Sequence, residues 1–188
     1  MFNDKFQVNQ SGSSLIDKNQ NKKKKLSRRE LFRNLFSIRS ESLEGEVSGI
    51  DPDMIYADRL MKKRDYQRAL EYYTLRLEKE PGHLEAMRNL GYCRFKLGEP
   101  EKAIEAFEKV LSLRPGDNVA LLYLGLINAY RGNGEEAVRH WKSYFNIHKP
   151  LIQREINLIL ARHERGDRLD PQEMADMVAR AMEKQKSR

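Results

Sequence analysis

The side chains that most often carry chemistry are few in this chain and stand apart from one another. Its one cysteine, Cys93, has no histidine near it in the sequence. The histidines lie in different segments, at His83, His140, His148 and His163. A nucleophilic cysteine needs a group that lowers the pKa of its thiol, and zinc ligands are commonly paired within a few residues. Neither pattern occurs, so we expect no catalytic residue and no metal site, with Cys93 as a buried apolar side chain.

Carboxylates and glycines are numerous but indicate no active site. The carboxylates mostly alternate with lysine and arginine, which is typical of solvated helix faces. The glycines stand at predicted turns and helix crossings and form no phosphate-binding loop. We therefore expect a protein that is not an enzyme and that has no cofactor.

The composition indicates a helical protein with much exposed surface. Of its 188 residues, 39% are apolar and 34% charged, and the mean hydropathy is −0.78. No window reaches the ~18 apolar residues of a membrane span. A single cysteine excludes an intramolecular disulfide framework, and this fits a reducing compartment. We expect a cytoplasmic location, with peripheral attachment to the inner face of the membrane as an alternative.

A period of 34 residues sets where the helices must lie. It places three alanines, three aromatic residues, two glycines and two prolines in phase: Ala69, Ala103 and Ala137; Tyr73, Phe107 and Trp141; Gly91 and Gly125; Pro81 and Pro115. This pattern is the signature of stacked helical hairpins. It predicts three repeats at 50–83, 84–117 and 118–151, followed by C-terminal capping helices over 152–188.

The N-terminal 49 residues differ in character from the rest. They hold 10 Lys or Arg and 6 Asp or Glu, and eight of those basic residues fall within 22–39. We expect a disordered arm that contains a short basic amphipathic segment at about 28–38. Its contact residues would be Lys22, Lys23, Lys24, Lys25, Arg28, Arg29, Phe32, Arg33 and Phe36.

The repeat residues resemble the tetratricopeptide repeat family, which has Leu-Gly in its first helix and a small residue early in its second. Repeat two matches best, with Leu90, Gly91, Gly98, Ala103, Ile104, Phe107, Leu113 and Pro115. Repeat one diverges most, since Tyr56 and Ala57 replace Leu-Gly, and repeat three has Lys149 at the proline position. The resemblance implies an all-α, right-handed solenoid of three hairpins.

The resemblance also implies that a peptide or a partner helix binds on the concave face made by the first helices. The residues mapped to that face are Arg88, Asn89, Tyr92, Lys96, Val119, Leu122, Tyr123, Leu126 and Tyr130. Only Asn89 matches the clamp that some members use for a C-terminal carboxylate. Two alternatives stay open for Leu122, Leu126 and Tyr130, which form either part of a groove or a core under the C-terminal helix.

The sequence therefore favours a protein-interaction adaptor whose client binds on this face. The alternative is a membrane-associated assembly factor, used for example in redox-enzyme maturation, because Ser27–Arg33 resembles a twin-arginine motif. The basic arm would then bind anionic lipid. The arm could equally be a solvated tail, and nucleic-acid binding is disfavoured because the repeats show no basic stripe.

Vesicle sedimentation tests the membrane alternative. If the arm binds anionic lipid, the full-length protein sediments with anionic vesicles and the protein lacking residues 1–49 stays in the supernatant. The physical reason is that each basic residue near the surface contributes about 1 kcal/mol. If both forms stay in the supernatant, the membrane hypothesis is wrong.

Overall fold

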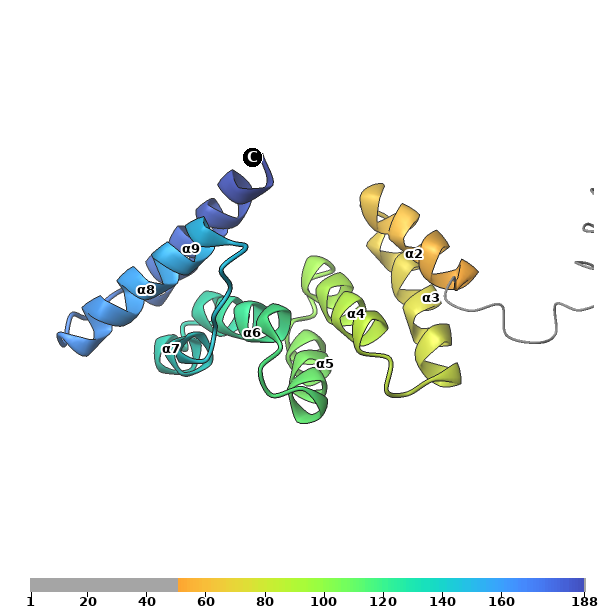
Figure 1. Cartoon of the computed structure of the whole chain (residues 1–188), viewed down its shortest axis with the longest axis horizontal. Helices are drawn as coiled ribbons and strands as arrows, with labels where there is room; N and C mark the ends of the chain where they lie inside the picture. The colour runs from red at the N-terminus through yellow and green to blue at the C-terminus, as the bar shows by residue number, and fades with distance from the viewer. Residues whose placement is uncertain (1–50, 188) are drawn as a thin grey trace, which may run out of the picture. The chain divides into compact units, whose positions relative to one another are not determined.

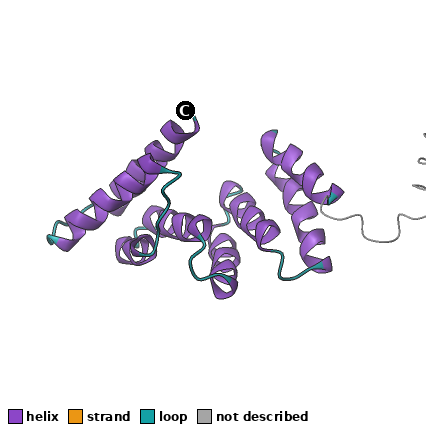
Figure 2. Cartoon of the chain, in the orientation of Figure 1, coloured by secondary structure: helices purple, strands orange, loops and turns teal. Residues whose placement is uncertain are grey.

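The computed structural model describes residues 51–187, and within them every regular element is an α-helix (Figures 1 and 2). The helices are α2 (Pro52–Lys62), α3 (Tyr66–Lys79), α4 (Leu84–Lys96), α5 (Pro100–Leu113), α6 (Asn118–Tyr130), α7 (Gly134–Lys142), α8 (Pro150–Glu164) and α9 (Pro171–Lys186). The predicted all-α fold is confirmed. The arm predicted over 1–49, with an amphipathic segment expected at about 28–38, lies outside the described residues.

Neighbouring helices pack as hairpins, and the hairpins stack. α2 packs on α3, α4 on α5, and α6 on α7. The second helix of one pair then packs on the first helix of the next, as α3 does on α4 and α5 on α6. Figure 1 follows this succession along the chain. Each hairpin thus buries its apolar side against its neighbours, which is how a repeat stack gains stability.

The helix ends follow from local chemistry. The Asp117 carboxylate accepts hydrogen bonds from the Val119 and Ala120 backbone N–H groups, each at 3.1 Å, and so caps the start of α6. The turn inside each hairpin needs a left-handed residue, which Gly98 and Gly132 provide with φ of 76° and 80°. Repeat one has Arg64 at the same position of the period, with φ of 61°. Because a side chain there is strained, repeat one carries a local cost that the other two avoid.

A small residue opposite an aromatic ring sets the distance between the two helices of a hairpin. A Cβ atom added to Gly91 would lie 3.1 Å from the Phe107 ring, and one added to Gly125 would lie 2.2 Å from Nε1 of Trp141. The Trp141 indole N–H donates to the Leu122 carbonyl oxygen at 3.3 Å, which holds the ring in place. Because Gly125 has no Cβ atom, α6 and α7 can pack closely with the whole indole ring of Trp141 between them.

The third repeat departs from the period in its second helix. α3 and α5 have 14 residues each, whereas α7 has nine and ends at Lys142. Residues 143–149 form a loop in which Tyr144 turns into the core and is 4% exposed. The Asn118 side chain donates to the Phe145 carbonyl oxygen at 2.7 Å and accepts from the Phe145 N–H at 3.2 Å. These two hydrogen bonds pair the N–H and C=O groups of Phe145, which would have been paired within the helix if α7 had continued.

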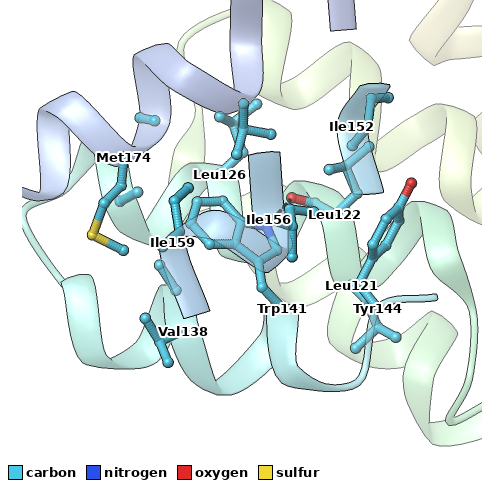
Figure 3. Packing of buried hydrophobic residues seen from close by; sticks show 14 of the residues in the cluster. Leu121, Leu122, Leu126, Val138, Trp141, Tyr144, Ile152, Ile156, Ile159 and Met174 are labelled. Atoms are coloured by element: carbon cyan, nitrogen blue, oxygen red, sulfur yellow. Dashed lines mark hydrogen bonds between the residues drawn. The ribbon is translucent and has the colours of Figure 1, made fainter. Parts of the chain in front are cut away.

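The terminal hairpin of α8 and α9 is also not a fourth regular repeat. α9, the second helix of this pair, packs on α6 as well as on α8. Met174, Ala175, Val178 and Ala181 of α9 join the apolar cluster around Trp141, together with Ile152, Ile156 and Ile159 of α8 (Figure 3). The end of the repeat stack is therefore covered by two helices.

The contact between Gly125 and Trp141 can be tested by one methyl group. We expect Gly125→Ala to lower the free energy of unfolding by roughly 1–3 kcal/mol, because a buried indole must move to admit the Cβ atom. For a protein of this size, each kcal/mol lowers Tm by about 2–4 °C. The matched control is Gly116→Ala, since nothing lies within 4 Å of a Cβ atom there. Equal melting temperatures for the two variants would contradict this packing.

Candidate protein-binding surface

The predicted partner-binding residues lie on two adjacent first helices. Arg88, Asn89, Tyr92 and Lys96 lie on α4, and Val119, Leu122, Tyr123, Leu126 and Tyr130 lie on α6. We use the term first-helix surface for the exposed and half-buried side chains of α2, α4 and α6, together with Tyr66 at the start of α3. α4 and α6 contact each other directly, so the two groups of residues meet.

The centre of the first-helix surface is an aromatic cluster made of Tyr66, Tyr92, Phe95, Tyr123 and Tyr130. Tyr92 packs edge-on against Tyr66 and Tyr123, with ring centroids 6.0 and 5.4 Å apart. Phe95 packs against Tyr123 at 5.8 Å and stacks on Tyr130 at 6.5 Å. Such pairs add about 0.5–1.5 kcal/mol each beyond burial. The cluster is thus a rigid platform that is apolar yet partly exposed.

Lys96 adds a positive charge to the aromatic cluster. Its Nζ lies 5.6 Å from the ring centroids of both Tyr92 and Phe95, within the range of a cation–π interaction. Burial raises the pKa of the Tyr92 hydroxyl to about 12, and it also raises the pKa of Tyr123. Both phenols therefore stay neutral at physiological pH, and the charges near them are those of Lys96 and of Glu183 on α9.

Sequence reasoning omitted two members of the cluster from the candidate site, Tyr66 and Phe95. Phe95 stands three residues after Tyr92, a spacing that places two side chains on neighbouring positions of a helix face. The spacing from Tyr92 could therefore have indicated Phe95 as a member of the cluster. Tyr66 begins α3, a second helix, and only its packing on Tyr92 brings it to the surface of the first helices.

Two of the predicted polar residues already have partners inside the chain. The Arg88 guanidinium lies 3.3 Å from Oδ2 of Asp117, the buried residue that caps α6. The Asn89 side-chain amide donates to the Tyr73 hydroxyl at 3.2 Å, and that hydroxyl donates to Asp58 at 2.8 Å. Arg88 and Asn89 therefore tie neighbouring helices together, which leaves Lys96 as the exposed cation of the predicted group.

Leu122 and Leu126 are core residues, which is the second of the two alternatives that the sequence left open for them. They are 7% and 3% exposed and belong to the cluster that α8 and α9 complete (Figure 3). The reason is that an open stack end exposes apolar surface, and α9 covers it. Tyr130, in contrast, is 40% exposed.

A cleft of about 190 Å³ opens beside α9, which we name the α6–α9 cleft. The residues that line it are Asn118, Val119, Leu122, Tyr123, Tyr144, Asn146, Lys149, Ile152, Met182, Gln185 and Lys186. Three predicted residues, Val119, Leu122 and Tyr123, thus share this cleft. Lys96 and Tyr130 instead line a second depression of about 540 Å³, with Phe95 and Arg131.

The described residues offer little that could drive a reaction. Cys93 is fully buried, its Sγ lies 3.2 Å from Sδ of Met61, and burial raises the pKa of its thiol to about 12. Such a thiol is almost wholly protonated near neutral pH and is a poor nucleophile. Within residues 51–187, no three His, Cys, Asp or Glu side chains gather as metal ligands do. In the same range no helix has the length and apolar character to cross a membrane.

The geometry defines a class, a stack of helical hairpins with a 34-residue period. A family model described as tetratricopeptide repeat matches residues 57–118 and 95–141. The crystal structure of MamA resembles this chain with a TM-score of 0.54 and 18% identity, covering 87% of this chain and 99% of that one, a likeness of fold. Residues 57–141 of the chain thus form tetratricopeptide repeats, and such repeats serve as protein–protein interaction scaffolds.

Curated relatives match only in short stretches. The chain is 39% identical over 64 residues to a protein CTR9 homolog of Arabidopsis thaliana, which is 34% of this chain and 6% of that protein. It is 45% identical over 51 residues to an FK506-binding protein-like protein of Mus musculus, which is 27% of this chain and 15% of that protein. The likeness to a probable UDP-N-acetylglucosamine–peptide N-acetylglucosaminyltransferase SPINDLY of Hordeum vulgare is 28% over 87 residues, which is 46% of this chain and 9% of that protein. The chain thus spans less than a sixth of each relative.

Truncation of Leu126 tests its place in the core. We expect Leu126→Ala to cost about 2–5 kcal/mol of unfolding free energy, because it leaves a cavity between α6 and α9. Val119→Ala serves as control, since Val119 lies on the same helix and is 38% exposed. Urea denaturation followed by circular dichroism measures both. A Leu126→Ala variant as stable as the control would show that α9 does not cover this residue in solution.

Proposed function

We propose that this chain is a protein-interaction adaptor that binds a peptide or a helix of a client protein on its first-helix surface. Support comes from the repeat family, whose stacked hairpins serve as scaffolds for binding. Support also comes from the surface itself, where rings from three helices and one lysine form a rigid, partly exposed platform. Aromatic side chains dominate binding energy at protein interfaces.

The observation that carries the proposal is the position of Lys96 over two rings. A client that brings a carboxylate or an aromatic ring to this point would meet both a charge and an apolar platform. The adjoining depression of about 540 Å³ gives space for a client segment beside Tyr130. Within the cluster, Tyr92 and Tyr123 are held by their neighbours, so little side-chain entropy is lost on binding.

A non-enzymatic role fits the same residues. The reactive side chains of the described region are buried or scattered, as Cys93 shows. The relative named as a glycosyltransferase matches over 9% of its length, which is too little to carry its activity to this chain. We propose a cytoplasmic adaptor, and the membrane-associated alternative rests on the basic residues of the arm before residue 50.

Reversal of the charge at Lys96 tests the proposal. Tagged full-length protein is used to capture clients from cells of the source organism, and captured chains are quantified by mass spectrometry. We expect Lys96→Glu to reduce client recovery about tenfold, because it removes the cation–π contact and repels an acidic client. The fold should be unchanged, since Lys96 is exposed.

The matched control is Lys109→Glu, an equal charge change at an exposed position of α5. A client that is recovered equally by the wild type and by Lys96→Glu would contradict the proposed surface. Equal loss with both variants would show that only net charge matters.

A further inference from the structure

The α6–α9 cleft has the size and the lining of a pocket for one large apolar side chain. Its walls are mostly apolar, from Val119, Leu122, Tyr123, Tyr144, Ile152 and Met182. Its volume is about 190 Å³, and an apolar cavity of about 150 Å³ is enough to hold a benzene molecule. An aromatic ring or a leucine side chain therefore fits.

The two charged side chains that line the cleft are both lysines, and the Glu183 carboxylate of α9 lies beside one of them. Among the described residues that line it, only Lys149 and Lys186 are charged. Lys186 pairs with Glu183 on its own helix at 2.9 Å, but both side chains are exposed and such pairs contribute little. Lys149 makes no ion pair within residues 51–187 and is the N-cap of α8. The first turn of α8 has no acidic residue, so the positive end of its dipole adds to the lysines.

The loop that forms one wall is held in place before any partner binds. The Asn118 side chain makes two hydrogen bonds to the Phe145 backbone, and Gln153 accepts from the Asn146 N–H at 2.7 Å. On this fixed backbone, Phe145 and Ile147 are 69% and 68% exposed. A preformed wall lowers the cost of binding, and the two exposed side chains offer further apolar contact.

We infer that the α6–α9 cleft binds an internal acidic segment of the client, inserting one aromatic or leucine side chain whose neighbouring carboxylates pair with Lys149 and Lys186. The inference rests on the proposed function and names the chemistry of the client. An internal segment is chosen because Asn89 alone matches the clamp for a C-terminal carboxylate, and Asn89 is bonded to Tyr73. The cleft discriminates against basic segments because both of its charges are positive.

Selection from a library of random peptides tests this inference directly. Phage that display random 12-residue segments inside a coat protein are selected on immobilised full-length protein. We expect enriched sequences to carry Phe, Trp, Tyr or Leu within two residues of Asp or Glu. The strongest peptide, made with an amidated C-terminus, is then titrated by fluorescence anisotropy against the wild type and the variants.

Two variants alter the cleft by different means. Lys149→Glu reverses the charge of one lysine that lines the cleft, and Val119→Phe fills the apolar space of the cleft. We expect each to raise the Kd of the peptide at least tenfold, while Lys109→Glu leaves the Kd unchanged. Circular dichroism checks that each variant is folded. Should Val119→Phe fail to fold, Lys149→Glu decides the question, because Lys149 is exposed.

The possible failures are distinguishable. One outcome is that the peptide binds the wild type and both cleft variants equally but loses affinity for Lys96→Glu. In that case the α6–α9 cleft is not the binding site, and the proposed adaptor binds its client at the aromatic cluster. If the enriched sequences are basic, the charge assignment is wrong. If no sequence is enriched over the support without protein, this inference is overturned, and client capture by the full-length protein still decides the proposed function.

Discussion

The structure depends on the close approach of two helices over an aromatic ring. At Gly125 no Cβ atom can be accommodated against Trp141, and at Gly91 the Phe107 ring leaves only a tight space. Because the ring fills the hairpin, its partner must be small, and this requirement recurs every 34 residues. Ala57 meets it in repeat one, where it shares a buried cluster with Tyr73. The residues with the strongest period are thus committed to packing, and binding must use the side chains between them.

The end of the repeat stack then shapes the first-helix surface. α7 ends early at Lys142, so the chain turns back as a loop, and α9 rather than α8 lies on α6. These two departures bury Leu122 and Leu126 and leave a cleft at the edge of α9. Leu122, Tyr144 and Ile152 belong both to the apolar cluster that closes the stack and to the lining of the cleft, which couples stability at the C-terminal end to the shape of the surface.

The first-helix surface has two features. At its centre, aromatic rings lie beside a lysine, and at its edge, an apolar cleft is lined by two further lysines. Lys96 lies over Tyr92 and Phe95, whereas Lys149 stands at the start of α8. On the function that we propose, both arrangements would favour an acidic client with large apolar side chains. The internal bonds of Arg88 and Asn89 keep these features fixed, because they join α4 to the start of α6 and to α3.

The sequence by itself determined the helical hairpins and their spacing. The period and the glycines at 98 and 132 act locally, through backbone conformation, so they can be read from neighbouring residues. It also mapped Tyr92 and Lys96 to the face of a first helix, but it left open whether Tyr130 lies on the surface or in the core. Only the tertiary structure decided that α9 covers Leu122 and Leu126, that Tyr66 reaches the cluster, and that Tyr144 lines a cleft. These contacts join segments that are distant in the sequence and that the period does not relate. Which of these contacts form depends on which apolar helix faces meet at the end of the stack, and no local sequence pattern specifies which faces meet.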